Sequence, residues 1–149
     1  MYQRILVPLD GSELAECVLP HVKAIGRGCN IAEVILLEIV EPPPAWALEG
    51  VNLNALRNTN VKAATEYLAK VQSHLSSEGL NVIAEVLEGK AAETIAGFAK
   101  ENAVDFIAIA THGRSGMNRW VFGSVADKLL RSSHVPILMI RPAGGEPSV

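Results

Sequence analysis

Short runs of valine, isoleucine and leucine alternate along this chain with segments of helical periodicity, and this alternation limits the possible folds more than any other feature. Five such runs occur, at residues 4–9, 33–40, 81–87, 105–110 and 136–141. Their apolar residues are nearly continuous, which is typical of strands with both faces covered. The pattern predicts an α/β fold: an open, doubly wound, five-stranded parallel sheet with helices on both faces.

Four segments between these runs have apolar residues at helical spacing. They fall at about residues 14–25, 61–75, 91–102 and 124–131. Ser12 stands where the N-cap of the first helix is expected, and Gly26 and Gly28 predict its end. Ser124 and Asp127 have the spacing of a capping box, so the fourth helix is expected to begin at Ser124.

Two connections, residues 41–54 and 111–123, are long for a compact domain. Ligands of an open parallel sheet bind beyond the carboxyl ends of the strands, where the winding direction reverses. In the expected Rossmann-like strand order 3-2-1-4-5, the first and fourth strands are neighbours. The turns at 8–12 and 110–116 therefore share one crevice. Trp46 is expected either to cover a bound base or to lie half-buried beneath the proline-rich segment.

The second turn and the helix after it have the features of a phosphate site. Gly113 and Gly116 allow a ligand to approach the backbone closely. The Gly123-Ser124 pair opens a helix, whose free amides and positive dipole end attract anions. Each residue also has a purely structural explanation, because Ser124 is a suitable cap and glycines make turns. It is their convergence that favours a ligand.

Two charged residues fit a nucleotide at the same place. Either Arg114 or Arg119 would neutralise a polyphosphate, and Asp10 on the opposite turn suits a ribose hydroxyl or a magnesium ion. The two turns together predict a nucleotide site.

Three well-known motifs are absent. The Gly-Lys pair at 89–90 lacks the following Ser or Thr of a P-loop, and Gly26 and Gly28 lack the third glycine of the dinucleotide fingerprint. Residues 113–116 are one residue short of a Gly-x-Ser-x-Gly elbow. His112 has no evident orienting partner. We therefore expect no efficient enzyme, with slow ATP hydrolysis as a weaker alternative.

Composition narrows the class of protein further. The 149 residues carry 13 basic and 16 acidic side chains, a formal charge of −3, which disfavours nucleic acid as a partner. No apolar stretch approaches the roughly 18 residues of a membrane span, and no export signal is evident at the start. A cytoplasmic protein is expected, with one domain at 1–142 and a flexible tail at 143–149.

Four segments carry a resemblance to a known family. They are residues 5–12 (ILVPLDGS), 110–116 (ATHGRSG), 123–126 (GSVA) and 135–138 (VPIL). Together they resemble the universal stress protein family, over nearly the full length of the chain. ATP-binding members carry Gly, two residues, Gly, nine residues, then Gly and Ser or Thr. Here Ala110 takes the first position, and Gly113, Gly123 and Ser124 match the rest. An alanine is tolerated there if its φ is negative.

The resemblance implies a function and a set of binding residues. It places Pro8, Asp10 and Val40 around adenosine, and Ala110, Gly113, Arg114, Gly123, Ser124 and Val125 around ribose and phosphates. It implies an ATP-binding, or AMP- or ADP-binding, stress-response regulator that takes Mg²⁺ with its ligand, acts on a client protein and forms a homodimer through the last strand. The alternative is an interaction module of the same fold without nucleotide binding, which the departure at Ala110 favours.

Overall fold

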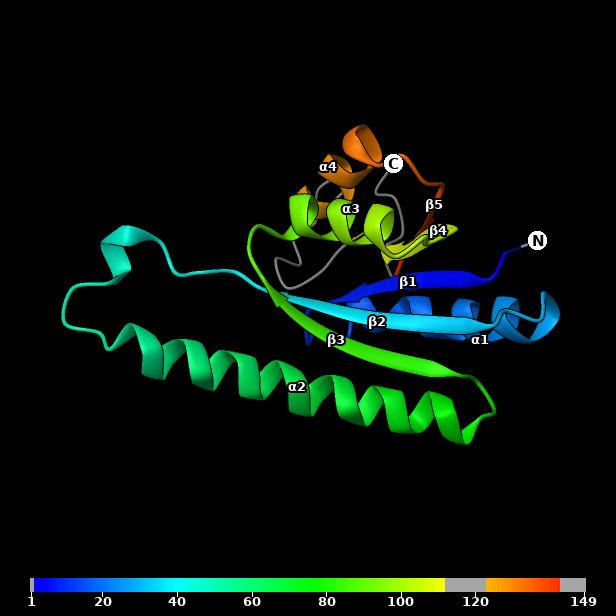
Figure 1. Cartoon of the computed structure of the whole chain (residues 1–149), viewed down its shortest axis with the longest axis horizontal. Helices are drawn as coiled ribbons and strands as arrows, with labels where there is room; N and C mark the ends of the chain where they lie inside the picture. The colour runs from blue at the N-terminus through cyan, green and yellow to red at the C-terminus, as the bar shows by residue number, and fades with distance from the viewer. Residues whose placement is uncertain (1, 112–122, 143–149) are drawn as a thin grey trace, which may run out of the picture.

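One parallel sheet organises the molecule, with strand order β3-β2-β1-β4-β5 as predicted (Figure 1). The structure is a computed structural model and describes residues 2–111 and 123–142. Its strands are β1 (Arg4–Leu9), β2 (Glu33–Val40), β3 (Val82–Glu88), β4 (Phe106–Ala110) and β5 (Ile137–Ile140). All neighbouring strands pair in parallel. The last three strands each begin one residue later than predicted.

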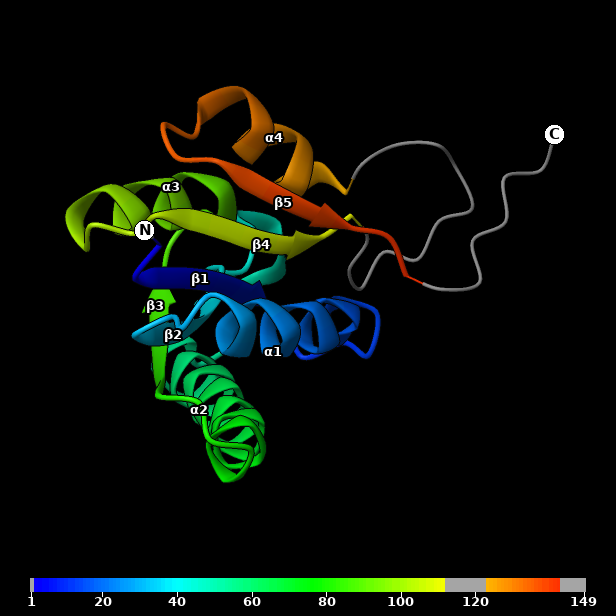
Figure 2. The ribbon, with the colours of Figure 1, turned by 90° about the vertical axis from the view of Figure 1, so that its right-hand side faces the viewer.

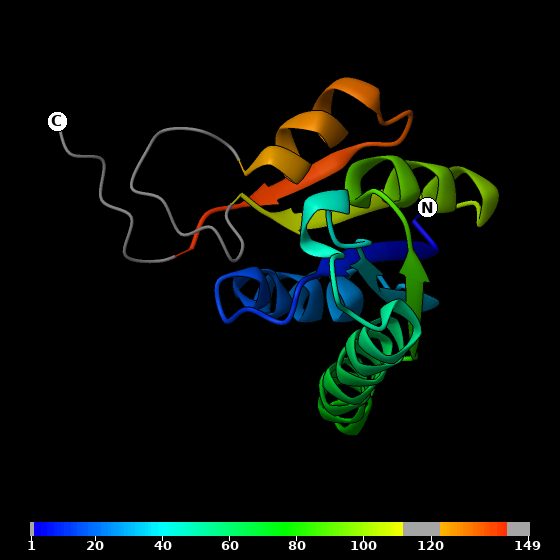
Figure 3. The ribbon, with the colours of Figure 1, turned by 90° about the vertical axis from the view of Figure 1, so that its left-hand side faces the viewer.

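Helices cover both faces of this sheet, which confirms the predicted α/β class. The helical elements are the 3-10 turn η1 (Ala15–Val18), α1 (Leu19–Gly28), the 3-10 turn η2 (Ala45–Ala47), α2 (Leu53–Ser77), α3 (Ala91–Glu101) and α4 (Ser124–Ser132). Helices α1 and α2 lie on one face, and α3 and α4 lie on the other (Figures 2 and 3). Successive strand residues point to opposite faces, so Ile5 and Val7 join one core layer and Leu6 joins the other.

The first helical segment begins differently from the prediction. Ser12 Oγ accepts a hydrogen bond from the Ala15 amide at 3.2 Å, so the hydroxyl bonds to the first residue of the 3-10 turn η1 and is not the N-cap of an α-helix. Helix α1 starts later, with Pro20 in its first turn. Proline has no amide hydrogen and is tolerated only there in an α-helix. The single predicted helix is therefore divided into two.

The end of α1 also corrects the prediction. Gly26 lies inside the helix, where an added Cβ would stand 2.9 Å from the Leu80 side chain. This glycine permits close packing and does not end the helix. Gly28 is the last helical residue, and Asn30 beyond it has a positive φ of 52°.

Helix α2 begins at Leu53, well before the predicted start at 61. Asn52 is its N-cap and accepts a hydrogen bond from the Ala55 amide at 3.2 Å. The buried residues of α2 begin only at its twelfth residue: Ala64, Leu68, Val71 and Leu75. The first half extends past the sheet (Figure 1), where Arg57 pairs with Glu88 of β3 at 2.6 Å.

The connection from β2 to α2 projects from the same end of the molecule (Figure 1). Trp46, in η2, is 83% exposed. The expectation of a half-buried tryptophan is therefore wrong, and coverage of a base stays a prediction. None of the helices in the described part of the chain has the length and hydropathy that a membrane span needs. The tail predicted at 143–149 lies outside the described residues.

Candidate functional site

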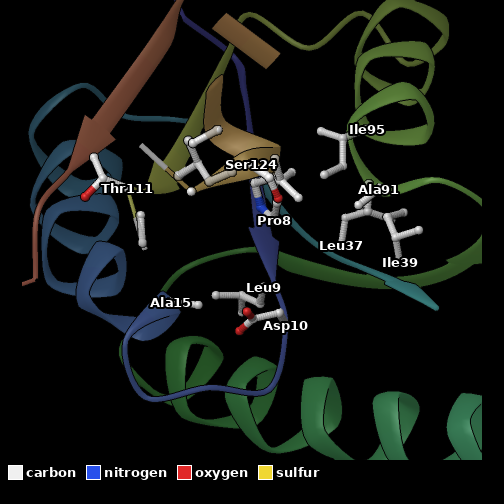
Figure 4. Close-up of a pocket in the computed structure, with 15 residues that line it drawn as sticks. Pro8, Leu9, Asp10, Ala15, Leu37, Ile39, Ala91, Ile95, Thr111 and Ser124 are labelled. Carbon is white, nitrogen blue, oxygen red and sulfur yellow. The ribbon is translucent and has the colours of Figure 1, made fainter. Parts of the chain in front are cut away.

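A pocket of about 240 Å³ opens at the carboxyl ends of the strands, between β1, β2, β4 and the first turns of α3 and α4 (Figure 4). It is lined by Pro8, Leu9, Asp10, Ala15, Leu37, Ile39, Ala91, Ile95, Ile109, Ala110, Thr111, Gly123, Ser124, Val125 and Ala126. This is where an open parallel sheet binds ligands.

Most of the predicted binding residues that the structure describes meet in this pocket. The six that line it are Pro8, Asp10, Ala110, Gly123, Ser124 and Val125. Val40 is not part of the wall, and its neighbour Ile39 takes that place. A role of Val40 in holding a base stays a prediction. Gly113, Arg114 and Gly116 lie outside the described residues.

A hydrogen-bonded turn after β1 fixes the side chain of Asp10. Its Oδ1 accepts hydrogen bonds from the Ser12 amide at 3.0 Å and the Ser12 hydroxyl at 2.5 Å. Gly11 between them has φ 81°, a conformation that favours glycine. The Asp-Gly-Ser sequence thus holds a carboxylate at one side of the pocket, with its orientation set before any ligand arrives.

The amino end of α4 forms another side of the pocket. Its N-cap is Gly123, and the next three residues, Ser124, Val125 and Ala126, all line the pocket. The first amides of a helix have no partner inside the helix and carry its positive dipole end. Among the described residues, no side chain caps α4. These amides can therefore receive an anion.

The predicted capping box at Ser124 is wrong. Ser124 is the first helical residue and not the N-cap, because Gly123 already has the extended ψ of 145° that a cap needs. Asp127 instead pairs with Arg131, one turn further on, at 3.2 Å. The Ser124 side chain is exposed at the pocket, as a ligand-binding hydroxyl would be.

Backbone hydrogen bonds of Thr111 join β5 to the start of α4 at one side of the pocket. The Thr111 amide donates to the Ile140 carbonyl of β5 at 2.8 Å, and the Thr111 carbonyl accepts from the Gly123 amide. The two ends of the connection 112–122 are thus joined at its base. The start of α4 is held against the ends of β4 and β5.

Ala110 fits its position without strain. It is the last residue of β4 and is 6% exposed. In the described part of the chain only Asn30 and Ala103 have a positive φ among residues other than glycine. The backbone at 110 therefore does not require glycine, which answers the steric question that the alanine raised.

The two ends of the pocket differ in character (Figure 4). Leu37, Ile39, Ala91 and Ile95 gather at one end and present only apolar side chains. Asp10, Thr111 and the start of α4 bring polar groups to the rest of it. A flat apolar group fits the first end, and hydroxyl and anionic groups fit the second.

Sequence interpretation missed the contribution of α3. Ala91 and Ile95 of its first turns line the apolar end. Glu41, directly after β2, accepts a hydrogen bond from the Ala91 amide at 2.9 Å and so caps α3 from 50 residues away. The only signal in the sequence was an acidic residue directly after a strand. The hydrogen-bond partner of that residue depends on the tertiary fold.

A tyrosine lies behind the Asp10 turn. The Tyr67 hydroxyl donates to Glu16 Oε1 at 2.9 Å and joins α2 to η1. Burial, this hydrogen bond, and the negative charges of Glu16, Glu38 and Asp10 together raise the pKa of Tyr67 far above its ordinary value. The tyrosine stays protonated and serves as a donor. Within the described residues, no group of three His, Cys, Asp or Glu side chains is arranged to hold a metal ion.

Comparison with known proteins gives concordant matches. A model of the universal stress protein family matches residues 1–141. The universal stress protein MJ0531 of Methanocaldococcus jannaschii is 30% identical over 142 residues, which cover 95% of this chain and 83% of that protein. The solved structure of MJ0577, from the same organism, has a TM-score of 0.86 and 30% identity, with coverage of 97% of this chain and 99% of that chain.

More distant structures share the fold and hold nucleotides. A universal stress protein of Archaeoglobus fulgidus in complex with dAMP has a TM-score of 0.70 and 22% identity, covering 93% of this chain and 98% of that chain. A universal stress protein family member from Arabidopsis thaliana with AMP bound has a TM-score of 0.70 and 16% identity, covering 95% of this chain and 93% of that chain.

Proposed function

Because the chain belongs to the universal stress protein family, we propose that it binds an adenine nucleotide, as ATP, ADP or AMP, in the pocket at the carboxyl ends of its strands. One observation carries this proposal. The Asp10 turn and the start of α4, which no side chain of the described residues caps, lie more than 100 residues apart in the sequence and line the same pocket. The AMP and dAMP complexes of proteins with this fold support it.

The pocket suggests how the nucleotide lies. The base fills the apolar end beside Ile39 and Ile95, and the ribose hydroxyls reach Asp10. The phosphates lie along the amides of residues 124–126, where the helix dipole stabilises negative charge. At about 240 Å³ the pocket is a little below the usual size of a small-molecule site, so the phosphates extend toward its mouth.

Magnesium enters this proposal with the ligand. Mg²⁺ is commonly held by one or two carboxylates together with substrate phosphates and water. Asp10 is the carboxylate that lines the described pocket, so the phosphates of ATP would supply most of the coordination. Magnesium there neutralises phosphate charge.

We assign the protein a regulatory role in a stress response and not an efficient catalytic one. Hydrolysis of ATP needs a base that is held by an orienting group. Asp10 accepts two hydrogen bonds from Ser12 and serves the ribose in this proposal. Turnover is accordingly slow or absent, and binding itself is the signal.

A homodimer through β5 belongs to the same proposal. β5 is an edge strand of the sheet, and all four of its residues are half-buried. Apolar edge strands are normally covered by another chain or element, and a second copy would pair with β5 across a twofold axis. A client protein would bind the nucleotide-bound form of this dimer.

Titration calorimetry tests the nucleotide site directly. We expect heat and saturable binding with ATP, ADP and AMP, and a rise in the melting temperature with ligand concentration because a ligand stabilises only the folded state it binds. Mass spectrometry of small molecules released from the purified protein is the independent measurement. The absence of heat and of thermal stabilisation with all three nucleotides at millimolar concentration would reject the proposal and favour an interaction module without nucleotide.

A further inference from the structure

Two helices begin at the pocket, and their amino ends differ in one respect. Ala91 at the start of α3 and residues 123–126 at the start of α4 both line the pocket. Both ends carry a positive dipole, which attracts the phosphates of a ligand equally well in principle. A nucleotide would therefore have two opposite ways to lie, unless one of the ends is already satisfied.

The first amide of α3 already has a partner within the protein. Glu41 Oε1 accepts a hydrogen bond from the Ala91 amide at 2.9 Å, whereas the N-cap residue Lys90 contributes no side-chain cap. This carboxylate occupies the position that a phosphate oxygen would take. The amino end of α4 has the cap Gly123, which has no side chain to offer.

Resting on the nucleotide site proposed above, we propose that Glu41 is a specificity-determining residue that fixes the direction in which the ligand lies. Its negative charge fills the amino end of α3 and repels phosphate from the apolar end of the pocket. The phosphates are left with the amino end of α4. The base then lies against Ala91 and Ile95, which present only apolar atoms from their side chains.

The charge and the hydrogen bond of Glu41 can be separated by substitution. Glu41→Gln keeps an oxygen that can accept from the Ala91 amide but removes the charge. Glu41→Ala removes both. Glu93→Gln is the matched control, because Glu93 is an exposed acidic residue in the same first turn of α3, whereas the Ala91 amide donates to Glu41.

Photolabelling with 8-azido-AMP reports where the base lies. Trypsin separates residues 28–57 and 91–100, at the apolar end, from residues 120–128, which contain the start of α4. In the native chain the label is expected in the first two peptides. Both Glu41 variants should raise the share in 120–128 by about twofold to fivefold, the size of one charge–dipole interaction at an exposed helix end.

Two further measurements complete the test. The effect of Glu41→Gln should shrink as salt rises, because the charge is exposed and is screened within about 10 Å at 0.1 M. Glu93→Gln should leave the distribution of label unchanged.

The outcomes distinguish this inference from the function on which it rests. If AMP protects the native chain from labelling but both Glu41 variants keep its distribution, the inference is overturned and the nucleotide site stands. If only Glu41→Ala changes the distribution, or Glu93→Gln changes it equally, the charge of Glu41 is not the cause. If the native chain takes up no label that AMP can displace, the nucleotide site and the inference fail together.

Discussion

The two ends of the sheet use their polar groups in opposite ways. At the amino end Asp105 accepts hydrogen bonds from the Gln3 and Arg4 amides at 2.6 and 2.8 Å. Arg4 in turn pairs with Glu33 at 3.1 Å and donates to the Asn102 carbonyl at 2.8 Å. At the carboxyl end the helix amides of α4 face a pocket.

The polar groups at the amino end of the sheet stabilise the fold, and those at the carboxyl end are available to a ligand. The polar groups at the amino end named above bind one another, so they stabilise the strand ends. At the carboxyl end, glycine turns and backbone hydrogen bonds hold the polar groups around an open pocket. A substitution at the amino end should therefore cost stability alone, and one at the carboxyl end should cost affinity.

Leu37 should be an exception, at which one substitution costs both stability and affinity. It lines the pocket and is fully buried. We expect Leu37→Ala to lower the free energy of unfolding by about 2–5 kcal/mol through loss of packing and the cavity left behind. Binding of AMP should weaken too. Urea unfolding and calorimetry measure the two effects. A loss of affinity without a loss of stability would show that Leu37 is not part of the core.

Gly123 should show the division most clearly. Gly123→Val places a branched side chain where phosphates approach α4, and we expect AMP binding to weaken about tenfold or more, which is about 1.4 kcal/mol. Its φ of −47° and ψ of 145° are allowed for valine, so stability should change by less than about 1 kcal/mol. Gly28→Val, with open space around its Cβ, is the control. Equal affinities of the native chain and Gly123→Val would contradict the phosphate assignment.

Asp105 tests the amino end. Hydrogen bonds from the Arg4 and Gln3 amides hold the pKa of Asp105 below its ordinary value. Asp105→Ala should cost about 1–2 kcal/mol, reduced by solvent exposure from the full value of such bonds, and should leave AMP affinity unchanged. Since the folded pKa is the lower one, the native advantage is present above about pH 4 and is lost as pH falls through the folded pKa. Urea unfolding from pH 2 to 7 measures it, and an advantage that persists at pH 2 would contradict the assignment.

Ser12 should give the smallest effect. Ser12→Ala removes the hydroxyl's hydrogen bonds to Asp10 and to the Ala15 amide but keeps the amide of residue 12 as a donor to Asp10, so we expect a loss of about 0.5–1 kcal/mol in stability and about twofold in AMP affinity. Ser133, whose hydroxyl bonds to the Val135 backbone at the amino end, is the matched control. Ser133→Ala should reduce stability alone. Equal effects of the two substitutions on AMP affinity would refute the comparison.

The sheet could be predicted from sequence because each strand is identified by its own residues. Unbroken apolar runs mark strands that are covered on both faces, and alternation with helices determines their parallel arrangement. The pocket followed from the same logic, since the carboxyl ends of neighbouring strands must meet. Asp10 and Gly123 both line this pocket, and their roles toward a ligand stay predictions.

The features that escaped prediction depend on partners far away in the sequence or on competing local signals. Glu41 caps α3 only because the fold brings residue 91 beside it. Ser124 and Gly123 both suit an N-cap, and the choice between them depends on how Thr111 holds the Gly123 amide. Gly26 has the local sequence of a helix end, because the packing of Leu80 against it leaves no trace in the neighbouring residues.

The overhang of α2 has a consequence for engineering the chain. Its first three turns rest on the Asn52 cap and the Arg57–Glu88 pair, with no buried side chain before Ala64. A peptide tag or a small inserted domain near Gly50, an exposed position with φ 74°, would therefore be accommodated without disturbing the two core layers. That position offers a site for attaching a reporter outside the two core layers.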